Sequence, residues 1–117
     1  MGIGSYGRSF TLADPACTTA GCKFTSGGNP GRCSASAGVL VFNEIQEIIN
    51  TGGAQVITDK KAAVKIVTWA NNHLVSYDDE ATLKTKMNYA NNLCLGSVIV
   101  WAASTDDNKG TAIPRVG

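Results

Sequence analysis

The fold is decided by residues 63–77, which read AVKIVTWANNHLVSY. In its first half, the side chains of Val64, Ile66 and Thr68 would lie on one face of a strand, and those of Lys65, Val67 and Trp69 on the other. This period of two is typical of a strand with one face buried and the other partly so. Asn71-Asn72 then provides a turn, and Lys60-Lys61 provides another just upstream. These signals predict three strands in a small antiparallel meander, at residues 54–59, 63–69 and 73–77.

A helix and a strongly apolar strand follow the meander. The helix is predicted from about residue 79 to 93, with Asp78 or Asp79 as its N-cap. Its apolar stripe consists of Leu83, Met87, Ala90 and Cys94. The apolar run SVIVWAA at 97–103 is typical of a strand buried on both faces of a parallel sheet. Because a helix that leads into such a strand indicates a β/α unit, we expect the chain to form part of something larger.

The N-terminal part combines a predicted strand, a long loop and a short helix. Residues 3–12 have the apolar and aromatic content of a strand. Residues 13–37 are rich in Gly, Pro, Ser and Thr, and they predict a long loop. The short helix is predicted at 43–50, with Asn43 as its N-cap and Gly52-Gly53 as its end. As an isolated chain the predicted fold class is therefore α+β, a small antiparallel meander with two helices.

Length and charge exclude several classes of partner. The 117 residues fit one domain, and the net charge of +1 comes from scattered basic residues, which argues against binding to nucleic acid or an anionic membrane. No apolar run approaches the roughly 20 residues that span a bilayer. The N-terminal residues lack the features of a signal peptide. The chain is therefore cytosolic, or its true start lies elsewhere.

The cysteines favour the second possibility. Cys17, Cys22 and Cys33 lie in the long loop, and Cys94 lies far downstream. Zinc sites need paired short spacings such as C-x-x-C, and no other metal ligand accompanies His73, so we expect no metal site. The four cysteines predict two disulfides formed in an oxidising compartment, with Cys94 joined to the N-terminal loop. Three pairings are possible, and the spacing does not choose among them.

Four segments in register resemble one family, the fungal-type chitinases of glycoside hydrolase family 18. YGRSFTL at 6–12 is similar to the start of the insertion domain of these chitinases. VSYDD at 75–79, with the helix after it, resembles the later part of that insertion. LGSVIVW at 95–101, followed by Asp106-Asp107, resembles the eighth strand of a (β/α)8 barrel. The cysteine-bearing loop at 17–33 is similar to that of fungal members, including killer-toxin-like chitinases.

The resemblance implies a division of the chain and a mechanism. Residues 1–9 would end the seventh barrel strand, and 10–79 would form the insertion domain. Residues 80–107 would supply the last helix and eighth strand, and 108–117 a loose tail. In the family a protonated Glu donates its proton to the glycosidic oxygen, while the N-acetyl oxygen of the substrate attacks the anomeric carbon. This chemistry uses no metal and no organic cofactor.

The catalytic run of the family is absent from this chain. The Glu ends a D-x-x-D-x-D-x-E run on the fourth barrel strand, and no carboxylates here have that spacing. The carboxylates are Asp14, Glu44, Glu47, Asp59, Asp78, Asp79, Glu80, Asp106 and Asp107. Since a barrel also cannot close from two strands, we expect no catalytic residue here and no hydrolysis by the chain alone.

The resemblance implies a sugar-binding surface instead. Trp101 matches the indole floor beneath the sugar at the scissile bond, and Tyr6 and Arg8 match positions near that subsite. Glu44 matches a position that contacts sugars further along the cleft. Trp69 has a weaker claim than Trp101, and packing within the insertion domain is the favoured interpretation for it.

Each of these residues also has a structural interpretation. Trp101 in an apolar strand is by default a core tryptophan. Arg8 can form an ion pair with Asp106 or Asp107, and Glu44 can be a solvated helix residue.

Two functions follow. The first is a piece of a secreted chitinase that hydrolyses β-1,4-N-acetylglucosamine polymers; this piece would supply cleft wall and sugar floor and would need the rest of the barrel as its partner. The second is a free-standing secreted protein, derived from a chitinase, that binds chito-oligosaccharides without hydrolysis. The absence of a signal peptide and the end of the chain just after the predicted eighth strand favour the first.

Overall fold

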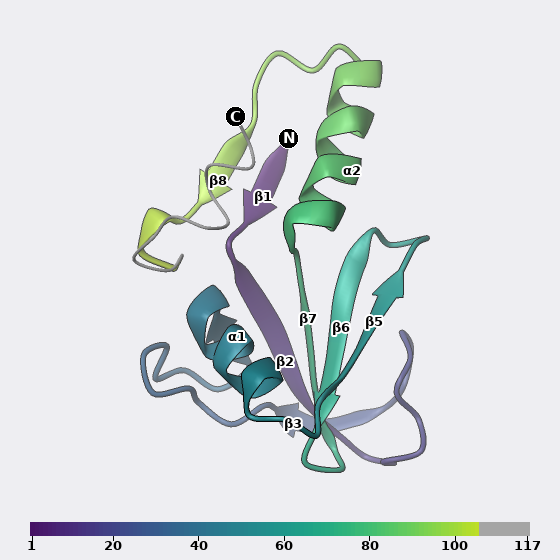
Figure 1. The fold of residues 1–117 in the computed structure, drawn as a ribbon, viewed down its shortest axis with the longest axis vertical. Coiled ribbons are helices and arrows are strands. Elements are labelled where there is room, and N and C mark those ends of the chain that lie inside the picture. Colours follow the sequence, from purple (N-terminus) through teal and green to yellow (C-terminus); the bar gives the residue numbers. More distant parts are fainter. Residues whose placement is uncertain (106–117) are drawn as a thin grey trace.

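The computed structural model describes residues 1–105, which form two β-sheets of different kinds (Figure 1). The larger sheet is antiparallel, with strand order β3-β2-β7-β6-β5, and β4 also pairs with β2. Its strands are β2 (Tyr6–Leu12), β3 (Phe24–Gly27), β4 (Val39–Val41), β5 (Gln55–Asp59), β6 (Val64–Trp69) and β7 (His73–Tyr77). The smaller sheet pairs β1 (Gly2–Gly4) in parallel with β8 (Ile99–Trp101). The chain passes from one sheet to the other at Ser5.

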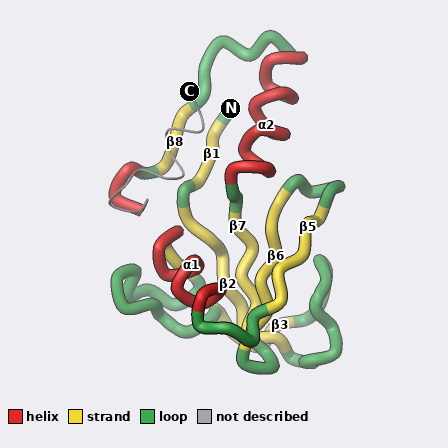
Figure 2. Tube along the Cα trace, in the orientation of Figure 1, coloured by secondary structure: helices red, strands yellow, loops and turns green. Residues whose placement is uncertain are grey.

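The helices connect and cover the sheets (Figure 2). The first helix, α1 (Phe42–Asn50), packs against the larger sheet, whereas α2 (Glu80–Asn92) leads from β7 toward β8. A short 3-10 helix, Ala103–Thr105, follows β8. Within residues 1–105, neither α-helix has the length and apolar character needed to cross a membrane. The α+β fold with two helices is thus confirmed.

The predicted meander is present, and its register explains the core. Val67 in β6 pairs with Val56 in β5 and with Val75 in β7. Val67 and Val75 are completely buried. Their apolar side chains point toward α1, where each contributes about 1.5–3 kcal/mol through burial.

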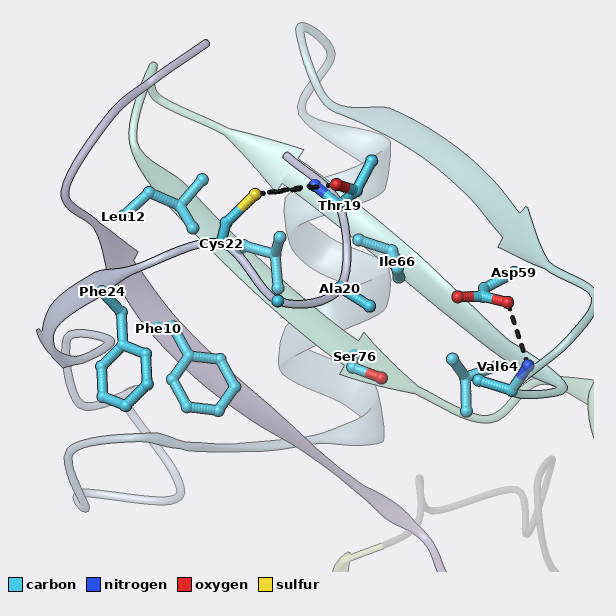
Figure 3. A pocket seen from close by; sticks show the side chains of 13 residues that line it. Phe10, Leu12, Thr19, Ala20, Cys22, Phe24, Asp59, Val64, Ile66 and Ser76 are labelled. Carbon is cyan, nitrogen blue, oxygen red and sulfur yellow. Dashed lines mark hydrogen bonds between the residues drawn. The ribbon is translucent and has the colours of Figure 1, made fainter. Parts of the chain in front are cut away.

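Apolar clusters lie on both faces of the larger sheet. The cluster beneath α1 consists of Leu40, Phe42, Ile45, Val67, Val75 and Tyr77. The opposite face carries Leu12, Ile66 and Leu74, with Phe10 and Cys22 packed against them (Figure 3). Trp69 packs against the first cluster, and its ring stacks on His73 with centroids 5.4 Å apart. The packing role expected for Trp69 is therefore confirmed.

The predicted N-cap of α1 is wrong. Because β4 runs directly into α1, the cap position falls on Val41, whose side chain cannot accept a hydrogen bond. Glu44 in the first turn compensates, since its Oε2 accepts from the Val41 N–H at 2.9 Å. Asn43 instead lies inside the helix. The predicted end is correct: the helix stops at Asn50, before Gly52 and Gly53, whose φ angles are positive.

The predicted start of α2 is correct, but its apolar stripe is only partly so. Asp79 is the N-cap, and its carboxylate accepts from the Thr82 N–H at 3.0 Å. Leu83 and Ala90 are buried as expected. Cys94 lies beyond the helix and is exposed, because the helix has ended at Asn92.

The long loop contains structure that its composition hides. Its residues 24–27 form β3 on the edge of β2, and the next strand, β4, was not predicted. The predicted tail at 108–117 lies outside the described residues, as do Asp106 and Asp107.

The parallel pairing expected for β8 is present, but its predicted burial is wrong. Ile99 is 69% exposed and Trp101 is 71% exposed. Within residues 1–105, β1 is the neighbour of β8; Ile3 of β1 is buried on the side of α2, whereas Ile99 and Trp101 of β8 remain uncovered.

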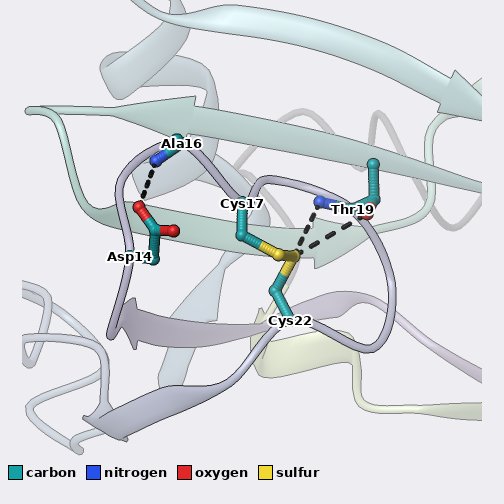
Figure 4. The surroundings of a disulfide bond; sticks show 5 residues. All are labelled: Asp14, Ala16, Cys17, Thr19 and Cys22. Carbon is teal, nitrogen blue, oxygen red and sulfur yellow. Dashed lines mark hydrogen bonds between the residues drawn. A yellow bond between two sulfur atoms is a disulfide. The ribbon is translucent and has the colours of Figure 1, made fainter.

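One of the two predicted disulfides forms. Cys17 and Cys22 are bonded within the long loop (Figure 4), whereas Cys33 and Cys94 are free and exposed. The predicted bond from Cys94 to the loop is therefore wrong. Cys33 lies beside the start of α1, while Cys94 follows α2 at the opposite end of the molecule (Figure 1).

Candidate functional site

The candidate site begins where the two parallel strands end. Gly2 is in register with Ile99, and Gly4 is in register with Trp101. The Ser5 N–H extends this ladder by donating to the Trp101 carbonyl at 3.0 Å. The carboxyl ends of β1 and β8 are thus fixed side by side, at the edge where α/β barrels place their functional groups.

A buried hydroxyl pair holds the backbone that follows Trp101. Ser5 is only 7% exposed, and its Oγ lies 2.6 Å from Thr105 Oγ1. Both hydroxyls also lie within 2.8 Å of the Ala102 carbonyl oxygen. Because each hydroxyl has one proton, one donates to the other and the second donates to the carbonyl. The Trp101–Ala102 peptide bond at this point is cis.

The sequence interpretation missed Ser5. Its only signal is a small polar residue inside the apolar, glycine-rich stretch GIGSYG. Its partner Thr105 lies 100 residues away, so no local pattern shows the contact.

Tyr6 and Arg8 form a column. A Cβ placed on Gly4 would lie 2.9 Å from Cε1 of Tyr6, so glycine leaves the room that this ring occupies. The guanidinium carbon of Arg8 lies 5.3 Å from the centroid of the Tyr6 ring. Such a cation–π contact contributes about 0.5–1 kcal/mol at an exposed position. Since Gly4 pairs with Trp101, the strand that leads into the column runs beside the strand that carries the indole.

Trp101 is presented to solvent. The structural interpretation of a core tryptophan is wrong for the described residues, because the side chain is 71% exposed while the adjoining backbone is fixed by Ser5. An exposed indole offers an apolar face with a polar N–H at its edge. This combination suits a ligand with an apolar face and peripheral hydroxyls.

Glu44 has a structural role that the sequence interpretation did not anticipate. It is 6% exposed rather than solvated. Its Oε1 accepts from the backbone N–H groups of Cys33 at 2.6 Å and Ser34 at 3.0 Å, and its Oε2 accepts from Val41 at 2.9 Å. The carboxylate therefore joins the long loop, β4 and α1.

The protonation of Glu44 reflects this environment. Burial is the largest single influence and favours the neutral form, but the backbone N–H donors of Ser34, Val41 and Cys33 together outweigh it. The pKa of Glu44 is consequently below its ordinary value of 4.5, and the group is ionised at neutral pH.

The structure thus places Tyr6 and Arg8 just beyond the end of β1, and Trp101 at the end of β8, the strand that pairs with β1. Glu44 lies next to them through the backbone, because Val41, whose N–H it accepts, pairs with Tyr6. The alternative partners of Arg8, Asp106 and Asp107, lie outside the described residues. Among residues 1–105, no group of His, Cys, Asp or Glu side chains is arranged to hold a metal ion.

Comparisons with known proteins show which family this chain is similar to. The sequence profile of the family described as Glycosyl hydrolases family 18 matches residues 1–106. Human chitinase-3-like protein 2 is 34% identical over 94% of this chain, which corresponds to 27% of that protein. Mouse chitotriosidase-1 is 33% identical over 95% of this chain and 23% of its own length. The chain therefore spans about a quarter of each of these relatives.

Solved structures show the same relationship. The Group IV chitinase of Ostrinia furnacalis, crystallised with allosamidin, has a TM-score of 0.90 at 29% identity, over 99% of this chain and 32% of its own. Human YKL-39, described as a pseudo-chitinase that retains binding of chitooligosaccharides, has a TM-score of 0.86 at 34% identity, over 98% of this chain and 30% of its own. The chain belongs to glycosyl hydrolase family 18.

Proposed function

We propose that this chain supplies part of the wall and the sugar-stacking floor of a chitin-binding cleft. Trp101 would stack on an N-acetylglucosamine unit, and Tyr6 and Arg8 would contact its edge. The observation that carries the proposal is the exposed indole of Trp101, whose backbone is held by Ser5 on the strand that pairs with β1. Allosamidin and chitooligosaccharides are named as ligands of the structurally similar proteins, which supports a saccharide as the ligand here.

Glu44 enters this site as a positioning residue. Its oxygens are occupied by three backbone N–H groups, so a direct sugar contact would require a hydroxyl to add to or replace one of them. By holding β4, it fixes the strand that pairs with Tyr6 and Arg8.

The proposed context is a longer, secreted chitinase of the fungal, killer-toxin-like type. It would cleave β-1,4-linked N-acetylglucosamine polymers by substrate-assisted catalysis, with the acid Glu outside this chain. The open edges of the β1–β8 pair and the exposed Ile99 and Trp101 support the rest of a barrel as the partner. The Cys17–Cys22 disulfide supports an oxidising compartment, and the cysteine-bearing loop supports the fungal type.

Titration calorimetry with chitopentaose tests the saccharide site. Wild-type protein is expected to bind, and Trp101→Ala to bind at least about tenfold more weakly, because a desolvated tryptophan commonly dominates a binding site. Trp69→Phe is the control, since Trp69 packs against the first core cluster, and it is expected to bind within about twofold of wild type. Equal affinity of Trp101→Ala and wild type would contradict the proposal.

The rival function is a free-standing, non-catalytic chito-oligosaccharide-binding protein. The description of YKL-39 as a pseudo-chitinase that retains such binding favours it. Both functions predict no hydrolysis by this chain. The two are separated by adding a barrel fragment that carries the catalytic run: recovery of chitin hydrolysis supports the first, whereas tight binding without recovery supports the second.

A further inference from the structure

A cavity of about 500 Å³ lies on the face of the larger sheet that is turned away from α1 (Figure 3). Gly7 faces Ile45 of α1, so Phe10, three residues further along β2, faces the other side. The cavity lies between β2, β6, β7 and the loop at residues 19–22. Its apolar lining includes Phe10, Leu12, Phe24, Val64, Ile66 and Leu74. This size falls within the range of small-molecule pockets.

The loop at residues 19–22, which forms one wall of the cavity, is held in place by covalent and hydrogen bonds. The Cys17–Cys22 disulfide closes the loop, and the Thr19 N–H lies 3.3 Å from the Cys22 sulfur (Figure 4). At the base of the loop the Ala13 N–H donates to the Lys23 carbonyl at 3.0 Å. The rings of Phe10 and Phe24 form an adjoining aromatic wall, with centroids 4.9 Å apart. A site with fixed walls loses little conformational entropy when it takes a ligand.

Two of the polar side chains that line the cavity, Asp59 and Thr19, already interact with other groups of the protein. Asp59 Oδ1 accepts from the N–H groups of Lys61 and Ala62 at 3.0 and 2.9 Å. The Thr19 hydroxyl faces the Cys22 sulfur. The described residues that line the cavity include no Lys, Arg or His to pair with an anion. An anionic ligand would therefore be desolvated without a partner, which is costly.

We propose that this cavity binds an uncharged, apolar small molecule with an aromatic or short aliphatic body. The site is distinct from the proposed saccharide surface, because it belongs to the six-stranded sheet, whereas Trp101 belongs to the β1–β8 pair. Binding of a small molecule in this cavity goes beyond the proposed function and does not depend on it. The disulfide-closed loop acts as the lid of the site.

The test uses N-phenyl-1-naphthylamine, an uncharged probe whose fluorescence rises in apolar surroundings. Ala20 lines the cavity from the loop, so Ala20→Phe fills it, whereas Ala16→Phe places the same ring on the same loop away from the lining. Wild type and Ala16→Phe are expected to bind the probe within about twofold of each other, and Ala20→Phe at least about tenfold more weakly. Equal binding by Ala20→Phe and wild type, or no binding by wild type, overturns the proposal.

Two further measurements guard against a misfolded variant and another occupant. In wild-type protein the probe is expected to shift the amide signals of Ile66 and Leu74, and shifts centred elsewhere overturn the proposal. The Cys17→Ser/Cys22→Ser variant is expected to bind more weakly because its lid is no longer closed. Size-exclusion chromatography that shows a dimer, broken by Ala20→Phe, would identify the face as a self-association surface and overturn the proposal. Excess chitopentaose is expected to leave probe binding unchanged, whatever the saccharide affinity.

Discussion

Glu44 shows, at the scale of a single residue, how an acidic side chain can be structural rather than catalytic. Three backbone N–H groups converge on its carboxylate from the long loop and from β4. A Cβ on Gly31 would overlap this carboxylate, which explains the glycine at that position. One side chain therefore fixes the approach of two segments to α1.

Removing the carboxylate should destabilise the fold. Glu44→Ala leaves three N–H groups without their acceptor, and we expect the free energy of unfolding to fall by about 3 kcal/mol. Urea denaturation measures this directly. Glu47→Ala is the matched control on the same helix: its carboxylate is exposed and contacts exposed Arg32, so we expect about 0.5 kcal/mol or less. Equal losses from the two variants would contradict the structural role.

The same carboxylate predicts a pH dependence with a definite sign. Because the folded pKa of Glu44 lies below its ordinary value of 4.5, ionised Glu44 stabilises the fold above that pH. The stabilisation is lost as the pH falls through the lower, folded pKa. Wild type should therefore lose stability more steeply than Glu44→Gln on acidification below about pH 5. Parallel curves for the two proteins would show that Glu44 does not contribute.

Gly4 gives a test of whether Tyr6 contributes to sugar binding, because an added Cβ is expected to matter at Gly4 and not at Gly2, the other end of β1. Gly4→Ala places a Cβ 2.9 Å from the Tyr6 ring, so the ring must move. Gly2→Ala on the same strand meets nothing within 4 Å and serves as the control. We expect calorimetry to show weaker chitopentaose binding for Gly4→Ala, by about fivefold or more, and little change for Gly2→Ala. Equal affinities of Gly4→Ala and Gly2→Ala for chitopentaose would show that Tyr6 does not contribute to the site.

At the scale of the elements, α2 starts with a reciprocal cap, of which the sequence predicts only the capping residue, Asp78 or Asp79. Asp79 accepts from the Thr82 N–H, and the Thr82 hydroxyl accepts from the Asp79 N–H, both at 3.0 Å. Asp79→Ala should lower the free energy of unfolding by about 1 kcal/mol, as measured by urea denaturation. Asp79→Asn keeps a capping oxygen and should lose much less, so equal losses would argue against the cap.

The elements that the sequence predicts are those whose signals are local. The meander shows alternation across residues 64–69 and turns on both sides, and α2 shows a polar cap before its buried Leu83. By contrast, β3 and β4 are short edge strands whose pairing with β2 spans residues far apart in the sequence. The N-cap of α1 at Val41 has no capping side chain to reveal it. Long-range contacts, rather than propensity, decide such elements.

The candidate site divides in the same way. Tyr6, Arg8 and Trp101 were predicted through their resemblance to family motifs, and the structure places them at or just beyond the ends of the paired strands β1 and β8. Ser5 and Gly4 were not found, because their roles depend on β8, which lies almost the whole chain away. The burial of Glu44 also depends on a loop whose composition predicts only irregular structure.

At the scale of the whole molecule, the disulfide and the free thiols give a direct chemical test. Native oxidised protein should show two reactive thiols, because Cys33 and Cys94 are exposed and free. Full reduction should raise the number to four. Reducing Cys17–Cys22 should lower the free energy of unfolding by about 2 kcal/mol, since the bond closes only a short loop. Thiol titration that finds none in the native protein would restore the second disulfide.

The two tryptophans that are candidates for sugar binding lie in different parts of the molecule. Trp69 lies in the larger sheet, half-buried against its core and stacked on His73, while Trp101 stands exposed at the end of the parallel pair. The two tryptophans of the chain therefore report on different regions.

The central claim is that the saccharide surface is built around Trp101. The most direct measurement is a two-dimensional NMR titration of the two indole N–H signals with chitopentaose, assigned through Trp69→Phe. The account predicts that the Trp101 signal shifts and saturates while the Trp69 signal stays in place. A shift confined to Trp69, or no shift at either indole at millimolar sugar, would contradict it.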